Sequence, residues 1–269
     1  MGCSKSLDLS PAAPAGAHLS FYWTMDEGGG ANKVDSTVGH VWNMIAGSTA
    51  EPGLFSNGTQ LDCTGALIAP HAHGLSNVAD ASLAIDSTVS KGIAFWFWFK
   101  LITPSSVIGR FIRPYFNFEF YSGGFVSDYL LQVRFDLIPG IGTSGWVLEH
   151  QDFNGPTDTQ SAGTFDLVLG TWHMFAGTFD LVNHTLKSYL DGVLKDTKPD
   201  PLIHNTTTQA DLWFQNNYAG IDIGNLFNAV VDELGMCLNG VLTQDQITAL
   251  WNGGAGVTWP GVNAIVNFP

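Results

Sequence analysis

The chain has 269 residues, of which 45% are hydrophobic and only 13% are charged. Ten lysines and arginines stand against 24 aspartates and glutamates, which gives a formal net charge of −14. A surface of this charge repels the phosphate backbone of nucleic acids and anionic membranes, so we expect neither as a partner. The low charged fraction implies a surface rich in Ser, Thr, Asn and Gly, which suits neutral polar ligands or a place in an assembly.

Short apolar runs separated by Gly, Asn and Asp predict an all-β sandwich. A second domain is not required, because sandwiches of roughly 200 to 250 residues commonly fold as one unit. We divide the chain into an N-terminal arm at residues 1–17, a body at residues 18–254 and a C-terminal tail at residues 255–269. The first residues lack the apolar stretch of a secretion signal, and no apolar run is long enough to span a membrane.

The most aromatic segment, residues 93–99, reads Ile-Ala-Phe-Trp-Phe-Trp-Phe. It is short for a helix and rich in residues that favour strands. On a strand its two tryptophans belong to one face and its three phenylalanines to the other. We therefore expect both faces to be covered: one by the sandwich core, the other by a long loop, a bound ligand or another chain.

Residues 172–195 predict consecutive antiparallel strands, because Asp191-Gly192 between apolar runs is a strong signal for a type I′ hairpin. The one good helix candidate runs from Thr243 to Asn252. Its first residue can act as N-cap, Gln246 occupies the reciprocal capping-box position, and the following glycine can end the helix. We expect this helix to pack at the edge of the sandwich.

Five segments, taken in order, carry a family resemblance. They are Leu19–Gly30 with its Asp-Glu turn, Val34-Asp35-Ser36 followed by Gly39, Phe97-Trp98-Phe99-Lys100, Thr171-Trp172-His173 with Tyr189-Leu190-Asp191-Gly192, and Val231-Asp232-Glu233-Leu234 with Leu242-Thr243 and Ile247–Asn252. Together they resemble the laminin-G-like, concanavalin-A-like jelly-roll family. The resemblance implies a two-sheet antiparallel jelly-roll sandwich (concanavalin A-like), with one short edge helix near the C-terminus.

In such folds the first and last strands lie side by side, so the resemblance places four carboxylates, Asp26, Glu27, Asp35 and Asp232, near one sheet edge. An oxygen-rich pocket of this kind suits a structural Ca²⁺. In the alternative interpretation Asp26 and Asp35 cap turns and Glu233 faces water, which turn chemistry alone explains.

Aromatic side chains on a concave sheet can stack on sugar rings. Among the nine tryptophans, those in polar or Gly-rich surroundings are the better ligand-binding candidates: Trp42, Trp146 and Trp213. We expect most of the other aromatic residues to belong to the core.

We predict no catalytic activity. Glycosidases with this sandwich place two carboxylates on one strand in a Glu-x-Asp-x-x-Glu pattern, and the sequence contains no such run. Asp232 and Glu233 are adjacent, so a regular strand would place them on opposite faces. No nucleophile elbow, P-loop or dinucleotide fingerprint is present either.

These observations favour a non-enzymatic virion structural or attachment protein, such as a decoration, fibre or tail component of a phage or virus, which also binds surface glycans. The family's fold is used mostly outside cells, yet the sequence shows no secretion signal; a virion protein made in the host cytoplasm satisfies both conditions. Its partners would be other virion proteins or copies of itself. The alternatives are a free carbohydrate-binding lectin or adhesion module, extracellular or at the cell surface, and a glycoside hydrolase with an unrecognised site.

Overall fold

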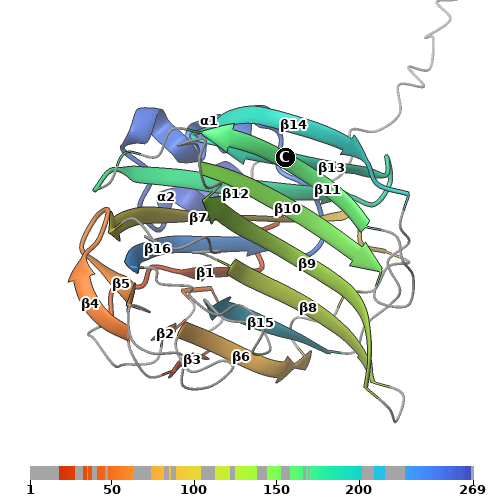
Figure 1. Ribbon diagram of the computed structural model, residues 1–269, viewed down its shortest axis with the longest axis horizontal. Helices are drawn as coiled ribbons and strands as arrows, with labels where there is room; N and C mark the ends of the chain where they lie inside the picture. Colours follow the sequence, from red (N-terminus) through yellow and green to blue (C-terminus); the bar gives the residue numbers. More distant parts are fainter. Residues whose placement is uncertain are drawn as a thin grey trace, which may run out of the picture.

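A computed structural model describes residues 18–27, 33–34, 36–37, 41–45, 48–62, 74–81, 85, 89–103, 113–121, 125–137, 144–152, 158–165, 168, 170–201, 209–215 and 228–267. Within these ranges the chain forms two sheets of eight strands each, and their paired strands run antiparallel (Figure 1). The predicted two-sheet antiparallel sandwich is confirmed.

The first sheet, which we name the back sheet, has the order β14-β13-β12-β7-β16-β5-β4, and β1 also pairs with β16. Its strands are β1 (Phe21–Trp23), β4 (Ser48–Pro52), β5 (Asn57–Asp62), β7 (Gly92–Thr103), β12 (Trp172–Asp180), β13 (Thr185–Leu190), β14 (Val193–Pro199) and β16 (Asn228–Cys237). β16 lies at its centre: β7 pairs with one edge, while β5 and β1 follow one another along the other edge. The first and last strands are therefore neighbours, as the resemblance implied.

The second sheet, which we name the front sheet, has the order β11-β10-β9-β8-β15-β6-β3-β2. Its strands are β2 (Lys33–Val34), β3 (Val41–Ile45), β6 (Gly74–Asp80), β8 (Arg113–Tyr121), β9 (Phe125–Leu137), β10 (Ser144–Asp152), β11 (Asp158–Phe165) and β15 (Gln209–Gln215). Strands β8, β9 and β10 face the viewer in Figure 1, and no described helix crosses them.

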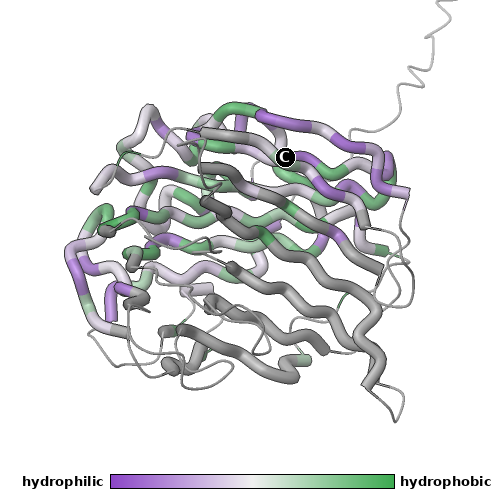
Figure 2. Tube along the Cα trace, viewed as in Figure 1, coloured by the Kyte–Doolittle hydropathy of each residue, from purple (hydrophilic) through white to green (hydrophobic). Residues whose placement is uncertain are grey.

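The core between the sheets contains the three phenylalanines of β7, each 0% exposed, together with Val133 of β9 and Leu148 of β10 from the front sheet. In Figure 2 the hydrophobic residues of the back sheet lie mainly along its middle strands, whereas β14 at the edge is largely hydrophilic. Alternation along β7 thus buries one aromatic row inside the sandwich and directs the other outward.

The outward aromatic row of β7 is covered by the end of the same chain. This segment comprises α1 (Gln244–Trp251), a short 3₁₀ turn η2 (Asn252–Gly254) and α2 (Gly261–Val266). Trp96 and Trp98 are 1% and 2% exposed, and the ring of Trp251 stacks on Trp98 with centroids 5.0 Å apart. Val262 and Val266 of α2 are buried in the same cluster. The second cover is therefore a terminal segment of this chain, and residues 255–267, expected to form a tail, belong to the folded body.

The local predictions for the helix and the hairpin are confirmed. Thr243 caps α1 with a complete capping box, and the helix ends at a left-handed Asn252. In the β13–β14 turn both Asp191 (φ 54°) and Gly192 (φ 75°) adopt the positive φ that a type I′ turn requires. The side chain of Gln244 donates a hydrogen bond to the carbonyl of that glycine, which ties α1 to the edge of the back sheet.

Candidate functional site

Two of the predicted metal ligands, Asp26 and Asp232, meet the turn that joins β4 to β5 at residues 53–56. Oδ2 of Asp232 accepts a hydrogen bond from the N–H of Leu54 at 2.7 Å, and Oδ1 of Asp26 accepts one from the N–H of Asn57 at 3.1 Å. The other oxygen of Asp232 accepts the N–H of the next residue in the chain at 3.0 Å. Backbone N–H groups donate to both carboxylates, so both residues act at least as turn anchors.

The other two predicted ligands do not complete a metal site in the described residues. Glu27 accepts a hydrogen bond from the N–H of Val34 at 2.7 Å, while Asp35 lies outside the described ranges. Where the chain is described, no group of three or more His, Cys, Asp and Glu side chains could hold a metal ion. The calcium site therefore stays a prediction.

Glu233 occupies an irregular position in the central strand of the back sheet. The register between β16 and β7 shifts between Asp232 and Gly235, and Glu233 has a positive φ of 51°. It is 3% exposed, so the interpretation that placed it in water is wrong, and its Oε2 atom has no hydrogen-bond partner. Burial raises the pKa of this carboxyl from 4.5 to about 8. At neutral pH it is therefore mostly protonated and enclosed, with little access for a substrate.

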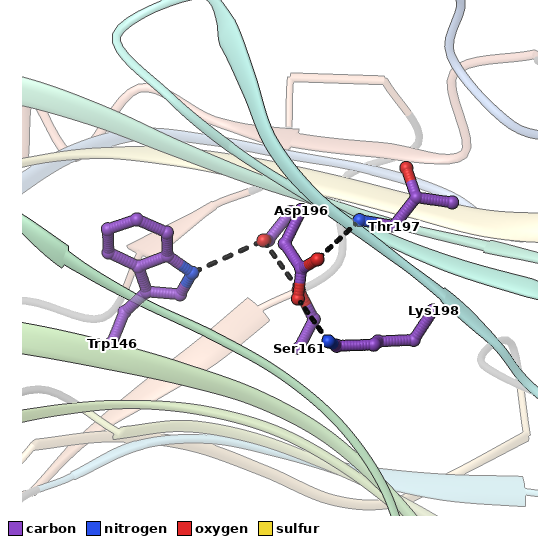
Figure 3. Close-up of polar contacts among 6 residues, drawn as sticks. Trp146, Ser161, Asp196, Thr197 and Lys198 are labelled. Carbon is purple, nitrogen blue, oxygen red and sulfur yellow. Dashed lines mark hydrogen bonds and ion pairs between the residues drawn. The ribbon is translucent and has the colours of Figure 1, made fainter.

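Trp146 belongs to a polar seam where the edges of the two sheets meet (Figure 3). Its indole N–H donates to Ser188 of β13 at 3.2 Å, and this hydroxyl lies 2.7 Å from that of Ser161 on β11. Ser161 in turn donates to Asp196 of β14 at 3.2 Å, and Lys198 lies 3.4 Å from the same carboxylate. Since Trp146 is 3% exposed, its ring offers no free face for a sugar, and it packs the seam instead of serving the predicted ligand role.

A second buried contact ties the same two sheets together. Nδ1 of His150 on β10 lies 2.7 Å from Oδ2 of Asp200, which follows β14, and the two side chains are 0% and 5% exposed. The ring of His150 also packs edge-on against Phe179 of β12. Sequence reasoning missed this pair, because its members lie 50 residues apart with no shared motif. We assign it to sandwich closure.

The outer face of the front sheet is exposed at β11, where its side chains are described. On β11, Gln160 and Ala162 are exposed, whereas Thr159 and Ser161 between the sheets are buried. No described helix covers this face in Figure 1, in contrast to the outer face of the back sheet. Trp213 lies on β15 and Trp42 on β3; their side chains are outside the described part, so their ligand roles stay predictions.

This architecture is that of a jelly-roll β-sandwich. The chain belongs to the concanavalin A-like lectin/glucanase superfamily, because the family's model matches residues 76–248, more than half of the sequence. The match runs from β6 to α1, so it spans most of both sheets.

Solved structures with a similar fold include binding domains of a mosquitocidal protein and of botulinum neurotoxins. The binding domain of Paraclostridial Mosquitocidal Protein 1 superposes with a TM-score of 0.59 at 11% identity, covering 88% of this chain and 52% of that one. The binding domain of botulinum neurotoxin serotype G gives 0.58 at 11% identity, covering 87% and 50%. That of botulinum neurotoxin DC, in complex with SialylT, gives 0.56 at 13% identity, covering 87% and 50%. The chain thus spans about half the length of these domains, and the likeness shows the fold alone.

No curated protein matches the chain. Neither α1 nor α2, nor any other helix in the described ranges, has the length and hydrophobicity needed to cross a membrane.

Proposed function

We propose that the chain is a non-enzymatic recognition module that binds glycans, and that it serves as a structural or attachment component of a virion. The observation that carries the proposal is the contrast between the two outer faces of the sandwich. The chain's own last helices close the back sheet, whereas no described helix lies over the front sheet (Figure 1). In a lectin-like fold, a sheet face over which no described helix lies is a suitable surface for a polar ligand.

Relatives of this fold support recognition over catalysis. Binding domains of several toxins share the fold, one of them solved with SialylT. Entry of botulinum neurotoxin type C into cells depends on interaction with two ganglioside molecules. Asp26 and Asp232 anchor a turn, and Asp200 helps to close the sandwich. Glu233 is buried, so it has little access to a substrate. None of these carboxylates forms the exposed pair that glycoside hydrolysis needs.

The virion role rests on the chemistry of the whole chain. A low charged fraction of 13% suits a subunit that is surrounded by neighbours. A charge of −14 also separates the protein from the packaged nucleic acid, since like charges repel. In this proposal the protein is made in the host cytoplasm and acts outside the cell. We expect antibodies against the chain to label purified particles; their absence from intact particles would overturn the virion role.

The test of glycan recognition is binding of the purified chain to a glycan array, once with Ca²⁺ and once with a chelator. Binding to a defined set of glycans supports the proposal, and binding lost on chelation would assign the ion a part in recognition. Absence of binding in both buffers would overturn glycan recognition. Reducing-sugar release from a polysaccharide, abolished by one carboxylate substitution, would overturn the non-enzymatic proposal.

A free lectin or adhesion module is the second candidate, favoured by the likeness to binding domains of toxins. This candidate predicts the same binding on the glycan array, but it predicts that antibodies against the chain do not label purified particles. Glycan binding by a chain that is absent from particles would select it.

A further inference from the structure

The backbone register of the front sheet aligns one residue from each of six strands in a single row, which we name the platform row. Its members, in order across the sheet, are Ser76 on β6, Trp213 on β15, Tyr115 on β8, Gln132 on β9, Glu149 on β10 and Gln160 on β11. Each residue is the cross-strand partner of the next. Two aromatic residues are thus adjacent, with an unbroken line of amide and carboxylate residues beside them.

The platform row belongs to the outer face. The neighbouring row runs through Leu212, Phe116, Leu131, His150 and Thr159. His150 and Thr159 of that row are buried between the sheets, at 0% and 9% exposure. Successive residues of a strand belong to opposite faces, so the platform row lies on the other side. Gln160 at its end is exposed, in agreement with this placement.

The residue types of the two rows differ as their faces require. The inner row is mostly apolar, whereas every member of the platform row is aromatic or carries hydrogen-bonding groups. Tryptophan and tyrosine present flat apolar rings with a polar edge, and amides and carboxylates can bond to hydroxyl groups. Exposure to solvent alone explains neither the two adjacent aromatic residues nor the amide residues that are aligned with them. This combination suits a ligand that has both apolar faces and many hydroxyls.

We propose that the platform row is the glycan-binding site and that it takes an extended, neutral oligosaccharide lying across the strands. This proposal rests on the proposed function. Adjacent strands lie about 4.8 Å apart, so a row of six strands is roughly 24 Å long, the length of an oligosaccharide rather than of a single sugar. With a charge of −14 on the chain and Glu149 in the row, an anionic glycan would be repelled.

The test uses neutral oligosaccharides of two to seven units, taken from the series that the array selects, and measures affinity by calorimetry. Trp213→Ala and Tyr115→Ala are expected to weaken binding at least tenfold, and Glu149→Gln severalfold. Trp172→Ala removes a half-buried aromatic from the opposite sheet and is the matched control, with unchanged affinity. Affinity should rise with chain length, and the sialylated counterpart should bind more weakly than the neutral chain.

Urea denaturation of each variant separates loss of binding from loss of folding. Glu149→Gln, which changes charge at nearly constant volume, keeps the test informative if removing an aromatic residue unfolds the chain. Wild-type affinity in all three row variants would overturn the platform row and leave the proposed function in place. Failure of the wild-type chain to bind any glycan would overturn the proposed function itself, and the platform row with it.

Discussion

Replacing Glu233 with glutamine should stabilise the protein increasingly as pH rises. The pKa of the buried carboxyl is about 8 in the folded chain, against 4.5 as the ordinary value. Below about pH 4.5 both states hold the proton; between the two values only the unfolded chain releases it, so stability falls as pH increases. Each pKa unit corresponds to about 1.4 kcal/mol. The carboxyl therefore lowers the free energy of unfolding by roughly 4 to 5 kcal/mol between about pH 4.5 and pH 8.

Glutamine has nearly the same shape and carries no charge at any pH, so it removes this dependence. Urea unfolding followed by tryptophan fluorescence at pH 5, 7 and 9 should give a small gain at pH 5 and most of the gain by pH 9. Glu51→Gln, on the edge strand β4, is the control and should change little. An equal effect of Glu233→Gln at pH 5 and pH 9 would refute the assignment of a buried, protonated carboxyl.

Three further substitutions test the packing. Gly235→Ala adds a Cβ that overlaps the ring of Trp96, so we expect a loss of roughly 3 kcal/mol in urea unfolding; a neutral result would show that the close approach is wrong. Trp251→Ala uncovers Trp98, its stacking partner, and should cost about 2 kcal/mol, with a red shift in fluorescence that would be absent if another segment formed the cover. Trp146→Phe keeps an aromatic ring but loses the N–H that bonds the seam, so stability should fall by about 1 kcal/mol with glycan affinity unchanged; weakened affinity would restore its ligand role.

The parts of the fold that depend on local chemistry could be predicted from the sequence. The capping box fixes where α1 begins, because Thr243 and Gln246 satisfy each other's backbone donors. Asp191-Gly192 fixes the hairpin, since both residues tolerate positive φ. The aromatic alternation of β7 correctly required two covers. In each case the deciding interactions lie within a few residues.

The identity of the second cover could not be predicted, because it depends on contacts between distant parts of the chain. α2 has no side-chain cap at its start, and its buried residues belong to a cluster that also contains the tryptophans of β7 and residues of α1. The partners of Asp232 were hidden for the same reason, since Leu54 lies 178 residues earlier. The bulge that buries Glu233 arises where β16 changes partner from β5 to β1, and two-residue alternation does not foresee such a change.

The candidate site likewise has one part that the sequence could predict and another that it could not. Trp213 could be selected from its polar surroundings, but those surroundings also selected Trp146, which the seam between β10 and β13 buries. The alternating aromatic and polar residues of β8 carried a signal for a two-faced strand. The alignment of this strand with Gln132 and Glu149 depends on the register between strands. Periodicity within a single strand does not contain that information.

The central place of β16 has a consequence for synthesis of the protein. The strand that joins β7, β5 and β1 ends at Cys237, and the other seven strands of the back sheet precede it in the chain. A ribosome therefore releases the middle of this sheet last. Until then those strands present unpaired edges, which are prone to join other chains. Contacts between such distant segments also form slowly. A nascent or prematurely terminated chain should therefore aggregate or depend on chaperones. A truncation from the C-terminal side that removes β16 should destabilise the protein far more than the number of residues removed would suggest.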